Sequence, residues 1–508
     1  MIDIYIDNVN CKIKGSIDEK HLKEIDRLMS YNHPGYMFMK GGKGGYGLGG
    51  KYGGWDGRIR LLTKSLVFPI GLLSLAQEYF EQNNISYKVI DTRRELIYGS
   101  EIPLVNPNFK LRDYQSAVVS KAYDAGSGII KVATGGGKSL IIASIAARYN
   151  IPTVIYVIGI ELLYQMKETL SRAYGIDCGI VGGGKCELGK KVTIMTIWSA
   201  AAAYNKKAKI ADNDTTQDSG SQIKALNKAE VKKTVEAAQL FIFDECQYAA
   251  SETLQFLHKA STSAKHRFLL SGTPWRDTGD DILIEAVSGK KICDVSATYL
   301  IKKGYLVPPD IHFVNVPVMR NVGKKYHDVY KNYIVENQDR NDLIIRAAKK
   351  LVAAKKKVLI LVVRVQHGKI LSDLLEKEFS VKFLDGGKSS TDRLKTIDAV
   401  KNGDIDILIA SKIFDQGVDI PDLDALILAG SGKSSGRALQ RIGRVIRLNP
   451  KSNKSKAIVV EFFDNCKYLR DHSEARIKVY ESEPGFNIKM PKKKVLHSYP
   501  SRKPVKWT

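Results

Sequence analysis

Residues 128–139 read GIIKVATGGGKS, a short apolar run followed at once by three glycines, a lysine and a serine. The next ten residues, 140–149, are mostly apolar and predict a helix. A strand, a glycine-rich turn and a helix in this order predict a phosphate-binding loop, because backbone N–H groups at a helix N-terminus bind phosphate oxygens. In such a loop Lys138 contacts the terminal phosphates and the Ser139 hydroxyl binds Mg²⁺.

Two acidic residues supply the carboxylates that such a site needs. Residues 240–243 are apolar and run directly into Asp244 and Glu245. This arrangement predicts that Asp244 orients Mg²⁺ through water and that Glu245 polarises the attacking water as general base. Taken alone, the same residues are explained better by a strand that meets solvent. A second GSGKS string, residues 430–434, has no such partner and is either a plain loop or a phosphate contact.

The composition is that of a globular protein that meets polyanions. Of the 508 residues 44% are hydrophobic and 26% charged, which excludes a disordered or collagen-like chain. The 79 Lys and Arg against 54 Asp and Glu give a net charge of +25, which favours nucleic acid as partner.

No apolar stretch approaches the roughly 20 residues of a membrane span. The start lacks a secretory signal, and the six cysteines form no CxxC pair, so a cytoplasmic protein without a zinc site is expected.

Composition shifts predict four parts. Short apolar runs alternate with helix-length amphipathic segments in residues 106–305 and again in 306–482. This alternation predicts two tandem α/β domains, each with a parallel sheet and helices on both faces. A small α+β N-terminal domain, residues 1–105, precedes them. Residues 483–508 form a basic C-terminal tail, either solvated or phosphate-binding.

Two segments interrupt this pattern. The run Gly41 to Gly54 is so rich in glycine that it is predicted to be a loop. The stretch Ala211 to Glu230 begins with polar residues that cannot form a core strand, so it is predicted to be an exposed insertion.

Further motifs flank the phosphate loop in a fixed order. LRDYQ at 111–115 precedes it, DECQ at 244–247 and SGTP at 271–274 follow it, and FDQGVDIPD at 414–422 and QRIGRVIR at 440–447 come later. In this order the motifs resemble those of the superfamily 2 helicases and translocases. The resemblance implies two RecA-like domains with ATP and Mg²⁺ in the cleft between them.

The same resemblance implies roles for single residues. Gln115 reads the adenine edge, Arg444 and Arg447 act as arginine fingers, and Gln440 lies near the nucleotide. The implied catalytic set is Lys138, Asp244, Glu245, Gln440, Arg444 and Arg447. The implied ATP-binding set is Arg112, Gln115, Thr134, Gly135, Gly136, Gly137, Lys138, Ser139, Gly417 and Asp419. The implied coupling residues are Ser271, Thr273 and Gln247, the last standing where many members have histidine.

Within this superfamily, the sequence resembles the UvsW-type helicases of tailed bacteriophages in particular. It rests on YGGWDGRIRLL at 52–62, RVQHG at 364–368 and YLRDHS at 468–473. This resemblance implies unwinding and branch migration of forks, Holliday junctions and R-loops in phage replication, recombination and repair. It also implies the host cytoplasm as the compartment, and replication and recombination proteins of phage or host as partners.

Several basic and aromatic residues are candidate DNA contacts. In the N-terminal domain arginines are interleaved with aromatic residues, which offers phosphate neutralisation and base stacking together, although a tryptophan in the core is an equal explanation. Arg364 and His367 follow the carboxyl end of a strand, where ligand-facing loops of α/β sheets lie. Arg276 either contacts DNA or pairs with a carboxylate. The set is Trp55, Arg58, Arg60, Arg276, Arg364 and His367.

The sequence therefore predicts an ATP-dependent DNA helicase or translocase that remodels branched DNA. An RNA helicase is one alternative, because the ATPase motifs do not read the sugar. A motor subunit of a restriction or repair complex is another. A basic scaffold with a degenerate nucleotide fold is disfavoured by the intact set Lys138, Asp244, Glu245 and Arg444.

Overall fold

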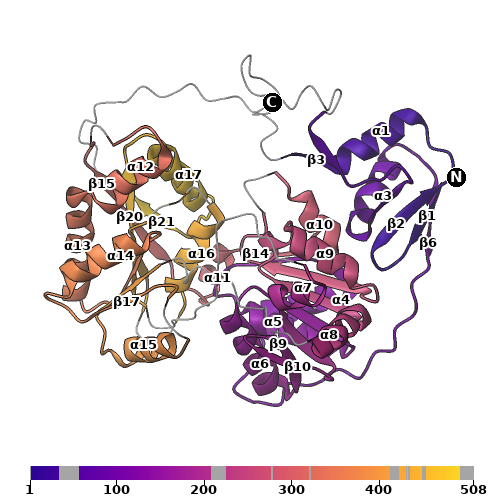
Figure 1. Ribbon diagram of the computed structural model, residues 1–508, viewed down its shortest axis with the longest axis horizontal. Coiled ribbons are helices and arrows are strands. Elements are labelled where there is room, and N and C mark those ends of the chain that lie inside the picture. The colour runs from indigo at the N-terminus through magenta and orange to yellow at the C-terminus, as the bar shows by residue number, and fades with distance from the viewer. Residues whose placement is uncertain are drawn as a thin grey trace. The chain divides into compact units, whose positions relative to one another are not determined.

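The computed structural model forms two compact units, which are described one after the other (Figure 1). The first comprises residues 1–306 with 414–419 and 434–444, and the second comprises residues 307–413, 420–433 and 445–508. The structure describes residues 2–33, 56–206, 225–275, 279–319, 322–387, 390–411, 423–430, 432, 435–448 and 454–491.

The first unit begins with a small α+β module. Its four-stranded sheet has the order β5-β2-β1-β6, and the side chains of Ile4, Phe68 and Phe80 are buried in its core. The strands are β1 (Ile2–Ile6), β2 (Asn10–Lys14), β5 (Val67–Pro69) and β6 (Tyr87–Asp91). Beside them lie helices α1 (Glu19–Leu28) and α3 (Leu73–Gln82) and the strand pair β3 (Ser30–Asn32) and β4 (Arg58–Arg60).

Residues 92–112 contain neither helix nor strand and run along the following α/β domain. The backbone N–H of Ile102 donates to the carbonyl of Ala147 at 3.1 Å, and that of Val105 donates to Ala173 at 2.9 Å. The compact module thus ends at β6, whereas the sequence alone places the domain boundary after residue 105.

An eight-stranded sheet forms the centre of the first unit, in the order β10-β9-β11-β8-β12-β13-β7-β14. Neighbouring strands are parallel except for β10 and β9. Every residue of β8 and β12 is buried, as expected for a parallel sheet covered on both faces. The strands are β7 (Ser127–Val132), β8 (Thr153–Val157), β9 (Cys178–Gly182), β10 (Lys185–Glu187), β11 (Val192–Thr196), β12 (Leu240–Asp244), β13 (His266–Ser271) and β14 (Lys291–Val295).

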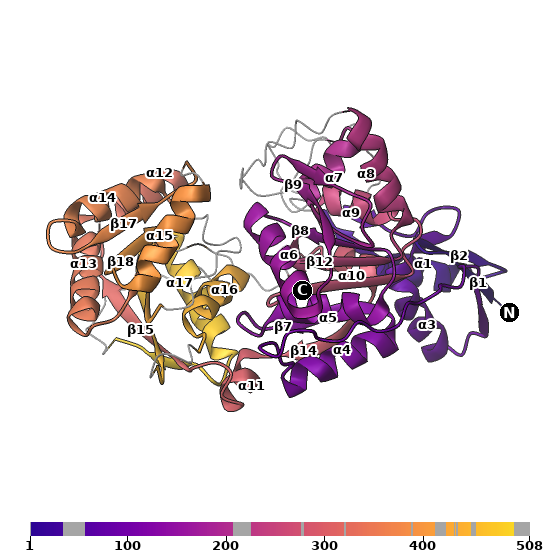
Figure 2. The ribbon, with the colours of Figure 1, turned by 90° about the horizontal axis from the view of Figure 1, so that it is seen from below.

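Helices flank this sheet, as Figure 2 shows. They are α4 (Asp113–Ala125), α5 (Lys138–Tyr149), α6 (Ile160–Tyr174), α7 (Ile197–Ala203), α8 (Ala225–Ala237), α9 (Glu252–Ala260), α10 (Ile282–Ser288) and α11 (Ala297–Lys302). Helix α16 (Ser435–Val445), from later in the chain, belongs to the same compact unit up to Arg444. The end of the predicted insertion is helical, because α8 begins at Ala225, and the buried residues Val231 and Val235 of this helix lie beyond the predicted stretch. The remainder of that stretch and the glycine-rich run lie outside the described residues.

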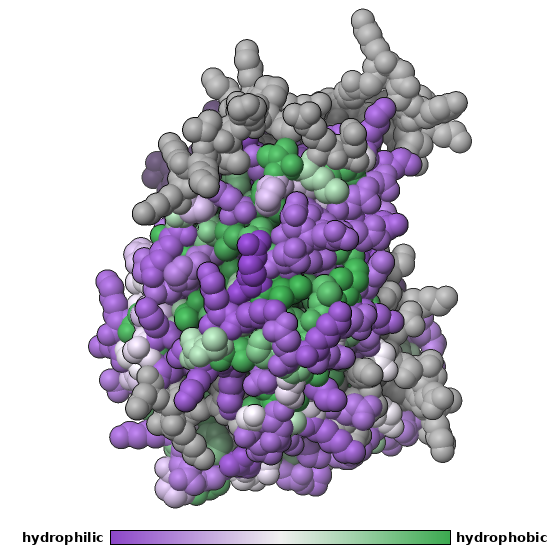
Figure 3. All heavy atoms as spheres, turned by 90° about the vertical axis from the view of Figure 1, so that its left-hand side faces the viewer, coloured by the Kyte–Doolittle hydropathy of each residue, from purple (hydrophilic) through white to green (hydrophobic). Residues whose placement is uncertain are grey.

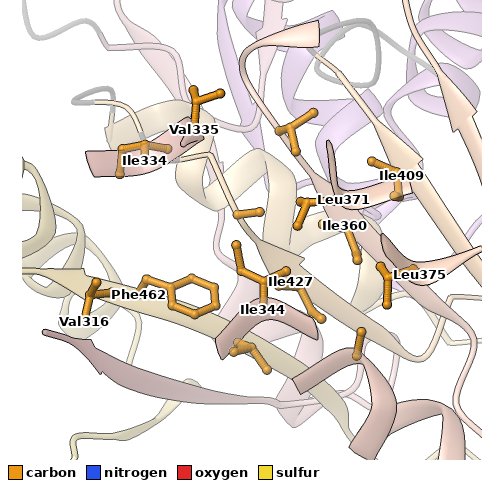
Figure 4. Packing of buried hydrophobic residues seen from close by; sticks show 14 of the residues in the cluster. Val316, Ile334, Val335, Ile344, Ile360, Leu371, Leu375, Ile409, Ile427 and Phe462 are labelled. Atoms are coloured by element: carbon orange, nitrogen blue, oxygen red, sulfur yellow. The ribbon is translucent and has the colours of Figure 1, made fainter. Parts of the chain in front are cut away.

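The second unit is built on a seven-stranded parallel sheet of order β17-β18-β16-β19-β20-β15-β21. Its core packs Ile360, Ile427 and Phe462 of the strands against Ile344 and Leu371 of the helices (Figure 4). The strands are β15 (Pro309–Val316), β16 (Val358–Leu361), β17 (Val381–Leu384), β18 (Ile407–Ala410), β19 (Ala425–Leu428), β20 (Ala457–Asp464) and β21 (Asn487–Lys489). The helices are α12 (Tyr326–Tyr330), α13 (Gln338–Ala353), α14 (Val365–Leu375), α15 (Ser390–Asn402) and α17 (Leu469–Glu481).

These sheets confirm the predicted fold class, which is two tandem α/β domains preceded in the chain by a small α+β domain.

The face of the molecule in Figure 3 is mostly hydrophilic, with hydrophobic residues visible between polar side chains. No helix in the described ranges combines the length and the apolar character needed to cross a bilayer. All six cysteines have free thiols.

Strand β21 corrects the expected start of the basic tail at residue 483. Its residues pair in parallel with Asp310 to His312 of β15. The Asp310 carboxylate holds the strand in place, because it accepts hydrogen bonds from Lys489 Nζ at 2.9 Å and from Asn487 Nδ2 at 2.8 Å. The start of the expected tail is therefore part of the second unit's sheet.

A buried ion pair joins helix α13 to the sheet of the second unit. Arg340 and Asp464 are both fully buried, and Arg340 Nε donates to Asp464 Oδ1 at 2.9 Å. Arg340 NH1 also donates to the carbonyl of Ala429 at 2.6 Å. The guanidinium thereby links α13 to the residue after β19 and to the last residue of β20.

The substitution Arg340→Met is expected to lower the free energy of unfolding by about 3–5 kcal/mol, because it leaves the Asp464 carboxylate buried without its partner. Urea denaturation followed by circular dichroism measures the change. Lys349→Met is the matched control, since Lys349 lies on the same helix in an exposed pair with Glu378. The control should cost no more than about 1 kcal/mol, and equal losses in both variants would contradict the assignment.

Candidate nucleotide site

The loop between β7 and α5 has a shape that only glycines allow. Gly135 and Gly137 have φ angles of 86° and 73°, in the left-handed region that favours glycine. A Cβ added to Gly136 would lie 2.5 Å from Val132 Cγ1, and one added to Gly137 would lie 2.5 Å from Gln115 Nε2. The loop leads into the N-terminus of the twelve-residue helix α5, where backbone amides bind phosphate.

Residues of the LRDYQ motif contact this loop from helix α4. Gln115 Nε2 and the Tyr114 hydroxyl both donate to the carbonyl of Gly136, at 3.2 and 2.6 Å. Gln115 Oε1 accepts a hydrogen bond from the backbone of Arg112, whose guanidinium lies 4.5 Å from the ring centroid of Tyr305. These contacts position the loop, and the adenine contact of Gln115 stays a prediction. Sequence reasoning assigned no role to Tyr114, although it lies inside the quoted motif.

Strand β12 carries Asp244 into a buried position at its carboxyl end. Asp244 is 4% exposed, and its Oδ1 accepts the backbone N–H of Glu245 at 3.0 Å. Burial, together with the neighbouring charge of Glu245, raises the pKa of Asp244 to about 7, and the charge of Lys138 opposes this shift. Glu245, immediately after the strand, has φ 69°, a left-handed conformation that is uncommon outside glycine.

A chain of hydrogen bonds connects Glu245 to the SGTP segment. Gln247 Nε2 donates to Glu245 Oε2 at 2.9 Å, and Gln247 Oε1 accepts from Ser271 Oγ at 2.7 Å. Ser271 Oγ in turn accepts the backbone N–H of Thr273 at 3.0 Å. The amide of Gln247 links the two motifs because it has both a donor and an acceptor end. The structure therefore brings together all three residues expected to couple hydrolysis to motion.

Helix α16 belongs to the first compact unit up to Arg444 and approaches the site closely. Gln440 Nε2 donates to Glu245 Oε2 at 3.1 Å, the same oxygen that Gln247 contacts. Gly443 permits this approach, because an added Cβ would lie 2.3 Å from the Cβ of Thr134. Sequence reasoning missed Gly443. Arg447 belongs to the second unit, and the arginine-finger roles stay predictions.

The described residues can hold Mg²⁺ in the way this ion prefers. Mg²⁺ keeps several waters and is bound through one or two protein oxygens together with substrate phosphates. The buried Asp244 carboxylate at the strand end, with Lys138 near enough to act on its charge, fits that pattern together with the Ser139 hydroxyl of the loop. Within the described ranges no group of three or more His, Cys, Asp and Glu side chains forms a separate metal site.

The arginines predicted to bind DNA in the N-terminal module have partners within it. Arg58 Nε donates to Ser30 Oγ at 2.8 Å, and its NH2 donates to the carbonyl of Arg27 at 3.0 Å. Arg60 pairs with Asp26 and with Asp56, at 2.6 Å in each case. A phosphate would have to replace these partners, so the DNA contacts of both arginines stay predictions.

The structure contradicts the prediction for His367, which has no exposed surface. Its Nε2 lies 2.9 Å from Asn341 Oδ1, and burial, together with the nearby charge of Arg340, lowers its pKa to about 3. His367 is therefore a neutral core residue and not a DNA contact. Arg364 is exposed, with its guanidinium 5.9 Å from the ring centroid of Tyr330. Four predicted site residues lie outside the described residues: Trp55, Arg276, Gly417 and Asp419.

Two protein families match the chain. The type III restriction enzyme res subunit family matches residues 108–276, which contain the phosphate loop and both carboxylates. The helicase conserved C-terminal domain family matches residues 341–449, which contain Gln440 and the two arginines of the last motif.

The chain is also similar to individual known proteins. The chain is 25% identical over 419 residues to the DNA 3′-5′ translocase XPB2 of Sulfurisphaera tokodaii, covering 74% of this chain and 86% of the relative. It is 24% identical over 515 residues to the ATP-dependent DNA helicase uvsW of Enterobacteria phage T4, covering 93% and 96%. Its fold resembles that of the type ISP restriction-modification enzyme LlaBIII bound to DNA, with a TM-score of 0.53 and 14% identity over 82% of this chain and 34% of that one.

Asp244→Asn is expected to stabilise the nucleotide-free protein, and more strongly at pH 8 than at pH 5. Because the pKa of Asp244 near 7 lies above its ordinary value of 3.8, the folded state holds a proton that the unfolded state has lost. The free energy of unfolding of the unsubstituted protein therefore falls as the pH rises through this window. The amide removes that loss, which should exceed about 1 kcal/mol, since one pKa unit corresponds to about 1.4 kcal/mol.

Urea denaturation of both proteins at the two pH values measures this difference. Asp124→Asn, which changes an exposed carboxylate on α4, is the control and should show no such dependence. A stabilisation by Asp244→Asn that is equal at both pH values would show that the carboxyl is not protonated in the folded protein.

Proposed function

We propose that the chain is an ATP-dependent DNA helicase of superfamily 2 that moves along DNA and unwinds or branch-migrates forks, Holliday junctions and R-loops. The proposal places this activity in phage replication, recombination and repair, in the cytoplasm of the host cell. Support comes from the likeness over nearly the whole chain to the uvsW helicase of phage T4 and from the +25 charge.

The observation that carries the proposal is the shared contact of Gln247 and Gln440 with Glu245 Oε2. Two amide donors hold one oxygen of the carboxylate and so orient the other, Oε1, to accept a proton from the attacking water. Gln440 comes from the last motif and Gln247 leads to Ser271, so one carboxylate contacts the elements that would respond to hydrolysis. A change at the terminal phosphate would reach both through Glu245.

The remaining roles are those that the phosphate-loop pattern and the resemblance to superfamily 2 helicases imply. Lys138 binds the terminal phosphates of ATP, and Ser139 and Asp244 hold Mg²⁺, the latter partly through water. The bound ion neutralises phosphate charge. Arg444 and Arg447 stabilise the charge that develops on the transferred phosphoryl group.

A second candidate function is the motor subunit of a restriction or repair complex. The match of residues 108–276 to the res subunit family favours it. Both candidates use the same ATPase site and differ in the DNA structure that activates it.

Lys138→Ala and Glu245→Gln are each expected to abolish ATP turnover. Loss of a general base costs about 10²- to 10⁴-fold in rate, and Glu245→Gln should still bind ATP because the phosphate-contacting groups remain. Steady-state hydrolysis and equilibrium binding of a fluorescent ATP analogue measure the two effects. Lys167→Ala, in an exposed pair with Glu187 in the same unit, is the control and should match the unsubstituted rate. An intact rate in either site variant would overturn the site.

The nucleic-acid substrate is tested by ATP hydrolysis with no nucleic acid, single-stranded DNA, duplex DNA, a four-way DNA junction and matched RNA at one fixed salt concentration. The junction should give the strongest stimulation if the protein remodels branched DNA. Stronger stimulation by plain duplex would support the restriction-type motor, and stimulation by RNA alone would overturn the assignment to DNA.

A further inference from the structure

The second unit carries a partly exposed group of aromatic rings and cations that the nucleotide site does not use. We call it the tyrosine patch. Its residues are Lys324, Lys325, Tyr326, Tyr330, Arg364, Lys467, Tyr468 and His472.

The patch lies at the carboxyl edge of the parallel sheet. Tyr326 begins helix α12 after β15, Arg364 precedes α14 after β16, and Tyr468 precedes α17 after β20. Figure 1 shows α12 and α17 at the same end of the unit. Because these strands are parallel members of one sheet, the three segments emerge at one edge, which is where α/β sheets bind ligands.

The rings form one contiguous surface centred on Tyr326. Its ring centroid lies 6.1 Å from that of Tyr468, 6.0 Å from that of Tyr330 and 5.8 Å from that of His472. Tyr326 and Tyr468 remain 42% and 37% exposed, while Tyr330 below them is buried. Aromatic rings that only complete a core would be covered, whereas these two present surface to solvent.

The backbone of Tyr468 is strained, and a hydrogen bond fixes its side chain. Its φ of 66° and ψ of −41° are unusual for a bulky residue. Its hydroxyl donates to the carbonyl of Lys324 at 3.2 Å, which joins the segment before α17 to the one before α12. Such outliers concentrate where function requires a particular side-chain position, as for Glu245 in the nucleotide site.

The cations around the rings suit a polyanion. Lys467 Nζ lies 4.7 Å from the ring centroid of Tyr468, and Lys324, Lys325 and Arg364 are exposed. In the part of the chain that the structure describes, none of these four cations forms an ion pair with a carboxylate. Their charges can therefore neutralise phosphates without displacing a carboxylate, although Lys467 Nζ also donates to the carbonyl of Lys324 at 3.2 Å.

We propose that the tyrosine patch binds single-stranded nucleic acid by stacking bases on Tyr326 and Tyr468 and holding the flanking phosphates with the surrounding cations. Exposed rings interleaved with cations are the pattern by which proteins bind single strands without reading sequence. This inference rests on the proposed function and deepens it, because it assigns a surface on which the motor holds a strand whose bases are unstacked.

The test measures binding of a fluorescent oligo(dT) by anisotropy to the full chain and to the double variant Tyr326→Leu/Tyr468→Leu. Leucine keeps apolar bulk but removes the stacking face, so the dissociation constant should rise about tenfold or more. Binding of a blunt duplex should change little, because its bases are already stacked. The salt dependence of oligo(dT) binding should keep its slope, whereas Lys324→Ala/Lys325→Ala should reduce that slope.

Tyr164→Leu is the matched control, since Tyr164 is a 38% exposed tyrosine on α6 with Lys185 Nζ 5.4 Å from its ring centroid. It should bind oligo(dT) like the unsubstituted chain. Tyr326→Phe/Tyr468→Phe keeps both rings and should also bind normally. Basal ATP hydrolysis should be equal in all variants, which shows that the leucine variant is folded.

A second measurement needs no variant. Oligo(dT) carrying 5-iodouracil should crosslink to Tyr326 or Tyr468 of the unsubstituted protein on irradiation, and mass spectrometry identifies the site. Normal binding by the leucine variant, or crosslinks confined to other residues, would overturn the proposal and leave the patch as a surface for a protein partner. Absence of DNA-stimulated hydrolysis in the unsubstituted protein would instead overturn the proposed function.

Discussion

The nucleotide site of the first unit depends on the burial of one carboxylate, that of Asp244. Strand β12 is buried along its whole length and delivers Asp244 to the sheet edge with almost no contact with water. A carboxylate in that position is costly unless positive charge faces it, and the opposing effect of Lys138 on its pKa shows which residue provides that charge. Lys138 can act from the first turn of α5 because the preceding glycines turn the chain sharply there. The burial of one strand and the glycines of the loop are therefore parts of one electrostatic arrangement.

The same strand end explains the position of Glu245. A residue that continued the extended strand would turn its side chain to the opposite face of the sheet, since successive side chains alternate. The left-handed conformation of Glu245 breaks this alternation, and its carboxylate meets the amides of Gln247 and Gln440. The backbone strain at this one residue thus makes a contact possible between two motifs that are far apart in the sequence.

The features that the sequence predicts well are local ones. The alternation of buried strands and amphipathic helices, the phosphate loop and the strand running into Asp244 each lie within a short segment whose pattern is sufficient. The position of His367 after a strand suggests a ligand-facing loop, but helical periodicity places it in the core. His367, Leu371 and Leu375 share the buried face of α14 at four-residue spacing, a signal visible in the sequence. Strand β21 has three residues and depends on Asp310, far away in the chain, so no local pattern reveals it.

The formal charge of +25 is a poor guide to where nucleic acid binds, because affinity comes from cations that exchange mobile counterions for phosphate. Arg60 illustrates the distinction, since its guanidinium already contacts the carboxylates of Asp26 and Asp56 and phosphate would compete with both. Arg340 is more extreme, because its charge is fully buried against Asp464 and serves the fold alone. Lys324 and Lys325 are exposed beside aromatic rings and face no such competition among the described residues. The cations that can bind a strand are therefore found by removing those the fold has already paired.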